Sequence, residues 1–276
     1  MKQFLCPICQ KELTSDGKSL SCNNRHTFDL SKSGYVNLLP PNAKHSKNPG
    51  DNKLMVDARK NFLEKGYYLP LVRELCAQAV RFSKGVKNPC VVDAGCGEGY
   101  YTSQVQQALS EVSQPEVFGI DISKFALNAA AKKNKAVRYA VGSVHHLPVA
   151  EGSCDLLLNL FAPYSGEEFR RVLKKDGIFI MVIPGEEHLL GLKEAIYEEA
   201  YKNEVKDYAL EGFELVHKAV VEDEILLKSQ EDIKNLFMMT PYYYKTSQAN
   251  KEKLDTLETL RTKIAFEILI YRKSES

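Results

Sequence analysis

Four residues near the N-terminus have the types and spacing of a metal site. Cys6 and Cys9 are separated by two residues, and Cys22 and His26, three residues apart, follow twelve residues later. Three thiolates and one imidazole complete a tetrahedral structural zinc site and leave no open position for a catalytic water. A redox pair of Cys6 and Cys9 is the alternative. We expect structural Zn²⁺ to supply much of the folding free energy of a small N-terminal domain.

A glycine-rich loop is the second chemical signal. It reads Asp93-Ala-Gly95-Cys-Gly97-Glu-Gly99 and stands between an apolar run and a helical pattern. Alternate glycines let the backbone approach a ligand that the N-terminal amides of the next helix also face. Tyr100 replaces the third glycine of the dinucleotide pattern, and the Lys-Ser/Thr of a phosphate loop is absent. Because Asp121 ends the next apolar run and can bind two ribose hydroxyls, we expect a ligand with a ribose and no pyrophosphate.

The elements that must position these residues alternate along the chain. Short apolar runs separated by helical stretches are typical of a parallel sheet with helices on its faces. We expect strands near 90–94, 116–121, 137–141, 154–159 and 177–183, with further extended runs at about 218–227 and 263–272. Helices are expected near 51–65, 68–83, 99–110, 123–133, 165–173, 187–202, 230–237 and 249–260.

Local signals mark the boundaries before this body. Asp16-Gly17 predicts a hairpin turn between the two halves of the metal site. Residues 39–50 are rich in Pro, Asn and Lys and predict a linker loop. Asp51 is expected to cap the first helix, which Gly66 ends.

Composition limits the class of protein. The 276 residues are 44% hydrophobic and 26% charged, with a formal net charge of +1 and seven cysteines. An odd cysteine count clustered near the N-terminus argues against a disulfide framework. Residues 1–50 carry seven basic and three acidic side chains, so this piece is basic and the remainder mildly acidic. No run resembles a membrane span or a secretory signal, and we expect a cytoplasmic protein without a membrane partner.

Further motifs connect the sequence to a known family. The glycine-rich loop, Asp121, Gly142-Ser-Val-His-His-Leu147-Pro148 and Arg171-Val-Leu-Lys-Lys-Asp-Gly177 occur in the order seen in class I S-adenosylmethionine methyltransferases, which they resemble. His45-Ser-Lys-Asn-Pro-Gly-Asp51, Tyr67-Tyr68 and Pro184-Gly185-Glu-Glu-His188-Leu189 accompany the metal-site residues. With these, the chain resembles, essentially end to end, the bacterial 23S ribosomal RNA guanine-N1 methyltransferases that carry an N-terminal zinc-binding domain.

This resemblance implies an α/β fold, a Rossmann-like sheet of about seven strands with a small zinc-binding domain. It implies S-adenosylmethionine as methyl donor, a 23S ribosomal RNA hairpin as substrate, and a zinc domain that grips the RNA. The expected domains are 1–36 for zinc and RNA recognition, 37–85 for linker and connecting helices, and 86–276 for methyl transfer. A homodimer is left open. The expected donor-binding residues are Tyr68, Asp93, Gly95, Gly97, Glu98, Asp121, Ser143 and His188, although many relatives carry an acid at the position of Ser143.

The group that handles the N1 proton is not assigned by the sequence. Guanine N1 carries a proton near neutrality, so a base or a stabiliser of the developing oxygen charge is needed. The candidates are Asn159, Tyr164, His145, His146, His188 and Glu186. The run 159–164 (NLFAPY) follows the fourth strand but departs from the Asn/Asp-Pro-Pro-Tyr/Phe motif of amino-directed methyltransferases in spacing and in one proline. It either caps the strand or lets Phe161 and Tyr164 stack on a flipped guanine.

Two other functions remain as alternatives. A small-molecule methyltransferase, for example on a quinone-like acceptor, predicts an apolar pocket and leaves the basic zinc module unexplained. A non-catalytic zinc-dependent RNA-binding protein would not need the intact glycines and Asp121.

Overall fold

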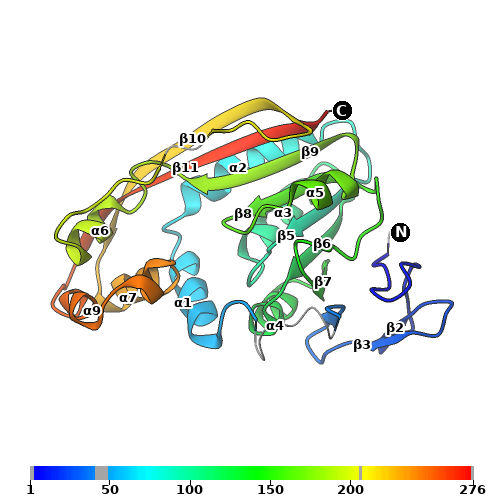
Figure 1. Ribbon diagram of the computed structural model, residues 1–276, viewed down its shortest axis with the longest axis horizontal. Helices are drawn as coiled ribbons and strands as arrows, with labels where there is room; N and C mark the ends of the chain where they lie inside the picture. The colour runs from blue at the N-terminus through cyan, green and yellow to red at the C-terminus, as the bar shows by residue number, and fades with distance from the viewer. Residues whose placement is uncertain (1–2, 41–48, 205–206, 275–276) are drawn as a thin grey trace.

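One large mixed sheet organises the molecule (Figure 1). The computed structural model describes residues 3–40, 49–204 and 207–274. Within them, eight strands lie in the order β10-β11-β9-β8-β5-β6-β7-β4. Their bounds are β4 Val36–Asn37, β5 Cys90–Ala94, β6 Glu116–Asp121, β7 Val137–Val141, β8 Cys154–Leu160, β9 Leu173–Pro184, β10 Phe213–Leu227 and β11 Leu260–Lys273. Strands β4 to β9 run parallel, and β10 and β11 join antiparallel.

The Rossmann-like sheet is therefore confirmed, with one strand more than the seven expected. All seven predicted strands are present, although β9, β10 and β11 begin earlier than their apolar runs. The additional strand, β4, follows the metal-site module and pairs with β7, with Val36 opposite Ala140. Two residues are too few to show an alternating pattern, which is why the sequence did not reveal it.

Both faces of the sheet are covered, one by helices and the other by a helix together with the N-terminal module. Alternate residues of β5 show the division: Val91 joins the core beneath α2 and α3, whereas Val92 joins a core shared with α5 and the N-terminal module. That module contains a small three-stranded sheet, β1 Thr14–Ser15, β2 Ser19–Ser21 and β3 Thr27–Asp29. The Phe4 ring of the module meets Phe118 edge-on at 5.1 Å, so the module takes the place of a covering helix there.

The helices lie near their expected positions, with three corrections. They are α1 Lys53–Glu64, α2 Leu69–Phe82, α3 Tyr100–Ser110, α4 Lys124–Lys133, α5 Gly166–Val172, α6 Leu190–Ile196, α7 Gln230–Met238, α8 Tyr242–Lys245 and α9 Gln248–Leu254. Asp51 does not cap α1, because the Asn52 side chain accepts the Met55 N–H instead. The helices expected over 187–202 and 249–260 are both shorter.

Tertiary contacts shorten these two helices. After α6 the chain folds back, because the buried Lys193 ammonium donates to the Tyr201 carbonyl and to Asn203 Oδ1. The Asn203 amide in turn donates to the Gly185 carbonyl. Helix α9 ends at Leu254 because β11 must begin at Leu260 to pair with β10.

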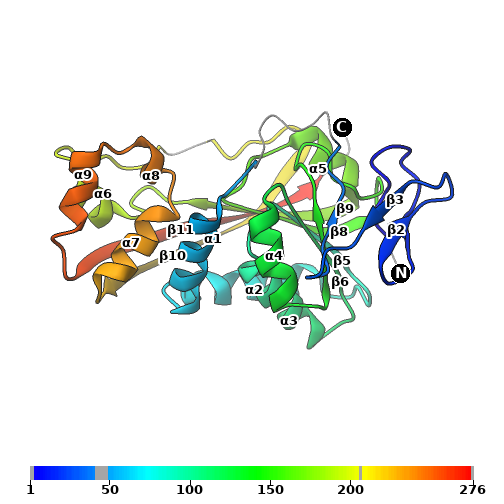
Figure 2. The same cartoon turned by 90° about the horizontal axis from the view of Figure 1, so that it is seen from below.

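Two modules lie at opposite ends of the sheet (Figure 2). Helices α6 to α9 form a lobe at the far end of the long strands β9 to β11, away from the N-terminal module. Helix α7 packs on α1, and Asp232 accepts from Lys65 and, at 2.9 Å, from the Tyr67 hydroxyl. The lobe is thereby attached to the chain just before Tyr68.

Two further expectations concern the N-terminal part. The Asp16-Gly17 turn is confirmed, since the Asp16 N–H donates to Ser19 O at 3.2 Å and Gly17 has a φ of +89°. The expected linker at 39–50 falls largely on residues 41–48, which lie outside the described residues. Among the described helices, none has the length and apolar character needed to cross a membrane.

Candidate functional site

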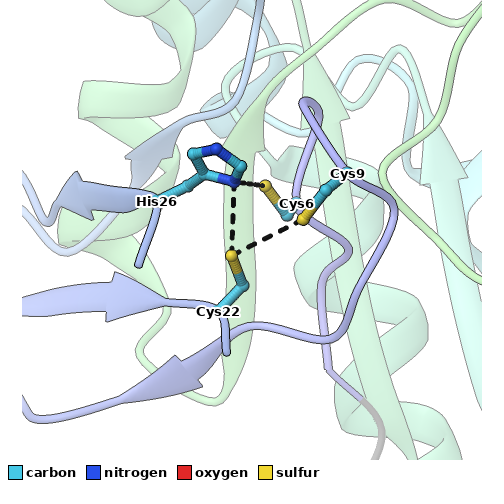
Figure 3. Close-up of side chains that lie close together, drawn as sticks. All are labelled: Cys6, Cys9, Cys22 and His26. Atoms are coloured by element: carbon cyan, nitrogen blue, oxygen red, sulfur yellow. Dashed lines mark hydrogen bonds between the residues drawn. The ribbon is translucent and has the colours of Figure 1, made fainter. Parts of the chain in front are cut away.

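The four predicted metal ligands converge on one point (Figure 3). Their ligand atoms all lie within 4.8 Å of one another. His26 Nδ1 is 3.5 Å from Cys6 Sγ and 3.4 Å from Cys22 Sγ, and the Cys9 and Cys22 sulfurs are 3.6 Å apart. Tetrahedral Zn²⁺ with bonds of about 2.3 Å to sulfur and 2.0 Å to nitrogen requires edges of about 3.5 to 3.8 Å. The residues present therefore fit a zinc ion.

Local structure favours the thiolate form of Cys22, whereas burial raises the pKa of the Cys6 thiol. Burial alone would raise the pKa of the Cys22 thiol, but hydrogen bonds from the backbone at His26 and Asn24 help to lower it to about 6. Metal binding requires the thiolate. The segment 6–9 turns on itself, with the Gln10 N–H donating to the Cys6 carbonyl at 2.9 Å.

The metal module is joined to the loop that follows β7. The Leu5 N–H donates to the Pro148 carbonyl at 2.9 Å, and the Gln10 amide nitrogen lies 3.4 Å from His146 Nε2. The same loop contains Ser143, whose side-chain oxygen accepts the His145 N–H. The module thus contacts the loop that contains Ser143, one of the expected donor-binding residues.

The second site lies where the parallel strands end. Strands β5, β6, β7 and β8 have their carboxyl ends at the same edge of the sheet. The glycine-rich loop, Asp121, Ser143 and Asn159 follow or end these strands, so they share this edge. In open parallel sheets this edge is the usual place of ligand binding.

Asp121 holds the glycine-rich loop in position. Its carboxylate accepts the Gly97 N–H at 2.9 Å and the Ser123 N–H at 2.7 Å. Burial raises the pKa of Asp121, and these two backbone hydrogen bonds oppose the rise. Each carboxylate oxygen keeps a lone pair, so a diol could bind there as well.

Two of the loop's glycines are needed for different reasons. Gly99 has a φ of +75°, and a Cβ there would lie 2.7 Å from the Tyr139 hydroxyl and 2.9 Å from Ala130 Cβ. A Cβ on Gly97 would meet nothing nearer than an Arg59 nitrogen at 3.7 Å, so it would project into open space beside that guanidinium. Gly99 therefore serves packing, whereas Gly97, with a φ of +54°, has the backbone conformation that favours glycine and leaves open space beside Arg59.

Buried acidic groups around the loop lack full pairing. Asp93 accepts the Thr102 hydroxyl at 2.6 Å through one oxygen, while the other has no hydrogen-bond partner among the described residues. Burial raises the pKa of Asp93 to about 7. Glu98 is also buried, its pKa is raised by that burial, and its Oε2 has no hydrogen-bond partner within the described part of the chain. A cationic ligand would relieve both groups, which fits a sulfonium donor that also carries an ammonium.

Arg59 of α1 reaches into this acidic cluster. Its Nη1 lies 2.5 Å from Asp51 Oδ2 and 3.6 Å from Glu98 Oε2, an ion pair without hydrogen-bond geometry at the second contact. Asp51 is itself attached to the neighbouring loop, since its carbonyl accepts the Ser123 hydroxyl at 2.7 Å. Nothing in the sequence alone distinguishes Arg59, because a lone arginine in a helix is normally a solvated side chain.

Tyr68 and His188 meet on the other side of the loop. The Tyr68 hydroxyl lies 3.4 Å from His188 Nε2, and both side chains are buried. Phe266 of β11 packs against both, with its ring centre 4.9 Å from that of Tyr68 and 4.6 Å from that of His188. Phe266 was also missed, because nothing in an apolar strand distinguishes a site residue from a core residue.

His188 is held as a neutral hydrogen-bond donor. Burial, with a smaller effect from Lys193, lowers the pKa of His188 to about 3. Its Nδ1 accepts the Ala265 N–H at 3.2 Å, which assigns the ring hydrogen to Nε2, facing Tyr68. Neither ring nitrogen is therefore placed to accept the proton of a substrate.

The other candidate bases are not assembled around the loop. His145 and His146 are exposed beside the metal module. Glu186 is exposed and pairs with Lys202 at 3.5 Å. Tyr164 is 37% exposed and packs its ring on Phe169 at 5.6 Å, at the margin of the core on the other face of the sheet.

Asn159 fixes the turn after β8. Its side-chain nitrogen donates to the Ala94 carbonyl at 2.9 Å and to the Pro163 carbonyl at 3.2 Å. Both amide hydrogens are therefore used by the backbone. Asn159 connects the turn to the strand that precedes the glycine-rich loop. It has no amide hydrogen left to donate to a guanine.

Comparisons with known proteins match both parts of the chain. Residues 4–47 match the zinc ribbon family described as "RlmA, N-terminal", and residues 86–240 match a family described as "Methyltransferase domain". A Streptomyces fradiae relative named 23S rRNA (guanine(748)-N(1))-methyltransferase is 37% identical over 71% of this chain and 68% of its own length.

One of two further relatives extends the match to almost the whole chain. A Bacillus subtilis (strain 168) protein, provisionally named 23S rRNA (guanine-N(1)-)-methyltransferase, is 30% identical over 98% of this chain and 97% of its own. A Micromonospora griseorubida protein with the same provisional name is 37% identical over 68% of this chain and 67% of its own length. With its zinc-ligand cluster and its glycine-rich loop at the sheet edge, the chain belongs to the 23S rRNA (guanine-N1)-methyltransferase family that carries an RlmA-type N-terminal zinc ribbon.

Proposed function

We propose that this protein transfers a methyl group from S-adenosylmethionine to N1 of a guanine in a hairpin of 23S ribosomal RNA. The observation that carries the proposal is the direct contact between the zinc ribbon and the loop containing Ser143. That contact joins a basic module to the edge of the sheet that holds the glycine-rich loop and Asp121. A small-molecule enzyme would have no use for this connection.

The donor site that we propose is formed by the expected residues and Arg59. Asp121 would bind the ribose hydroxyls, and the loop at Gly95 and Gly97 would lie against the donor, with Ser143 beside its adenine. The cationic end would face the oxygens of Asp93 and Glu98 that have no hydrogen-bond partner among the described residues. The Tyr68–His188 pair would close the site on the side of β11. When bound, S-adenosylmethionine supplies a methyl group already activated on a sulfonium.

Arg59 would bind the carboxylate of the donor's methionine part. Its guanidinium stands beside the space that Gly97 leaves open, and its contact with Glu98 lacks hydrogen-bond geometry. A planar guanidinium forms paired hydrogen bonds with a carboxylate. Arg59 could keep Asp51 as one partner and accept the donor as another.

The RNA side of the proposal rests on the zinc ribbon. Lys11, Lys18, Arg25 and Lys32 are all exposed on it and can contact phosphates. We assign residues 1–36 to zinc and RNA recognition through Cys6, Cys9, Cys22 and His26, residues 37–85 to the connection, and residues 86–276 to methyl transfer. An RNA hairpin would provide one compact element able to reach both the ribbon and the donor site.

At the guanine, N1 forms the new bond to carbon as the carbon–sulfur bond breaks, the sulfur keeps that electron pair, and the N1 proton leaves to water. His188 would position Tyr68 and not act as the base, since its Nδ1 is occupied and its ring stays neutral. The reaction would take place in the cytoplasm, where bacterial ribosomal RNA is made.

The test is transfer of labelled methyl from S-adenosylmethionine to protein-free large-subunit RNA from cells that lack this gene. We expect 1-methylguanosine in the digested product. A different methylated nucleoside would refute the assigned atom. Transfer to a quinone-like acceptor, with no label in RNA or ribosomal particles, would favour the small-molecule alternative. Light scattering of the same sample, with and without RNA, distinguishes a monomer from a homodimer.

A further inference from the structure

Phe161 has an unusual backbone conformation at the donor edge of the sheet. It follows β8 directly, with a φ of +54° in the left-handed region. Bulky side chains rarely adopt this strained conformation, which is retained mainly where function requires it. Its side chain is also 47% exposed, whereas Leu189, the other apolar residue with positive φ among those described, is buried.

The surrounding turn holds Phe161 in this strained conformation. The Phe161 N–H donates to the Val182 carbonyl of β9 at 3.2 Å. The Asn159 side-chain amide also fixes the turn, because it donates to the Ala94 carbonyl before the turn's neighbouring loop and to the Pro163 carbonyl within the turn. Ala162 lies so close to Gly95 that a Cβ on Gly95 would come within 2.4 Å of Ala162 Cβ. The position of Phe161 is therefore fixed relative to the glycine-rich loop.

The ring of Phe161 continues the aromatic wall of the donor site. Its centre lies 5.7 Å from that of Phe266 and 6.2 Å from that of Tyr101. Phe266 is the residue that packs on both Tyr68 and His188. Phe161 thus stands at the exposed end of a chain of rings whose buried end is the Tyr68–His188 pair.

The second aromatic residue of the same turn points elsewhere. Tyr164 packs edge-on against Phe169 at 5.6 Å and stacks on Phe179 at 6.1 Å, both in the core on the other face of the sheet. The structure therefore separates two residues that the sequence treated alike. Phe161 faces the donor edge, whereas Tyr164, itself 37% exposed, packs its ring against the core of the other face.

We infer that Phe161 is the platform on which the target guanine stacks when it leaves its own RNA stack. This inference rests on the proposed function and identifies the positioning residue for its substrate. A guanine must be extruded from a hairpin stem or stack before N1 can be reached, and an exposed aromatic ring replaces the lost stacking. A ring fixed to the glycine-rich loop holds the base plane in a constant relation to the donor.

The size of the effect follows from base–aromatic stacking. Removing an aromatic platform typically costs about 1–3 kcal/mol per base, which corresponds to about 5- to 150-fold in rate or affinity. Phosphate contacts dominate overall RNA affinity. The loss should therefore appear in the single-turnover rate at saturating RNA and much less in the RNA dissociation constant.

Glycine is the informative substitution, because it tolerates positive φ without strain. We expect Phe161→Gly to lower the single-turnover rate about 5- to 150-fold, and Phe161→Leu to lower it within the same range. Phe161→Tyr should stay within about threefold of the unchanged protein. The melting temperature of Phe161→Gly should not fall, and donor affinity by calorimetry should stay within about twofold. Tyr164→Leu serves as the matched variant and should lower the melting temperature while leaving the rate per folded enzyme within about twofold.

Several outcomes would overturn the inference. Full activity of Phe161→Leu would show that no aromatic platform is needed at this position. An equal loss of donor affinity in the glycine and leucine variants would place the ring in the donor site instead. Donor binding without any RNA methylation by the unchanged protein would refute the proposed function, and this inference with it.

Discussion

The zinc ribbon and the donor site are built in opposite ways. The ribbon's four ligands come from one stretch, residues 6–26, and meet within 4.8 Å. The donor edge collects side chains from residues as distant as Arg59 and Phe266, held on several strands and helices. A site whose parts are close in sequence can be recognised from spacing alone, because a metal ion dictates the ligand types. A site assembled by a sheet is visible only where a motif marks it.

The two sites also depend on different sources of free energy. The ribbon buries few side chains of its own, among them Leu13 and Leu20, and so depends on the metal. The donor edge is part of a large apolar core and should persist without a ligand. If this comparison holds, each site can be disabled while the other is left intact.

The largest expected effect is loss of the ribbon on metal removal. Structural zinc contributes roughly 10–16 kcal/mol of binding free energy in small domains, so Cys22→Ser or chelation should unfold the described residues before β4. Methyl transfer to RNA should then be lost, while calorimetric donor affinity changes by no more than about threefold. Cys76→Ser, a change at a thiol outside the cluster, is the control. Unchanged RNA methylation after metal loss would break the comparison, because the ribbon would then be dispensable.

Next in size is the effect of Asp121→Ala on the donor edge. The change removes the acceptor of the Gly97 and Ser123 N–H groups and the proposed partner of the ribose. Hydrogen bonds to charged groups contribute about 1.5–3 kcal/mol each, so donor affinity should fall about 100-fold or more. Calorimetry checks this, and RNA binding in a filter assay should be unchanged.

Asp121→Asn is the matched variant for this change. It keeps one acceptor oxygen and should lose less affinity than Asp121→Ala. Equal donor affinity in all three proteins would show that the carboxylate only supports the loop.

A smaller effect is expected for Arg59→Gln, and its pattern matters more than its size. If Arg59 binds the methionine carboxylate, affinity for S-adenosylmethionine should fall about 10- to 150-fold, the usual range for one charge-assisted bond. Affinity for methylthioadenosine, which lacks the amino-acid part, should not change. Equal losses for both ligands would instead assign Arg59 a structural role through Asp51 and Glu98.

The smallest effect is a pH dependence of stability from His188. The folded-state pKa is lowered by burial to about 3, below the unfolded value of about 6.5. The unfolded chain therefore binds the proton first, and stability from neutral His188 is lost as pH falls from about 6.5 toward 3, by at most about 1.4 kcal/mol per pH unit. Asp93, with its raised pKa, has the opposite slope, because its stabilisation is lost as pH rises through about 7.

The difference between two proteins isolates the histidine. Urea unfolding of the unchanged protein and of His188→Gln should give free energies of unfolding whose difference shifts in favour of the variant below about pH 6.5. Parallel curves from pH 7 to pH 4.5 would mean that His188 becomes protonated in the folded state without cost.

Sequence reasoning located the glycine-rich loop, Asp121 and the metal ligands because each has a fixed spacing or a fixed place after a strand. It also placed Tyr68 and His188, but through the resemblance to a family and not through a physical pattern. Arg59 and Phe266 could not be identified from the sequence. An arginine in a helix gives the same sequence pattern whether or not it lines a site, and so does a phenylalanine in a strand. The distinction between Phe161 and Tyr164 was equally hidden, since it depends on which side of one turn each ring faces.

The sequence by itself determined the ligands of the metal, the order of strands and helices, and the edge of the sheet where we propose that the donor binds. These follow from local rules: the ligand preferences of zinc, the period of apolar residues, and the common direction of parallel strands. Only the tertiary structure decided which buried carboxylate oxygens lack a hydrogen-bond partner among the described residues, that Arg59 stands beside Gly97, and that the ribbon touches the loop of Ser143. Such contacts join residues far apart in the chain, and long-range packing sets them.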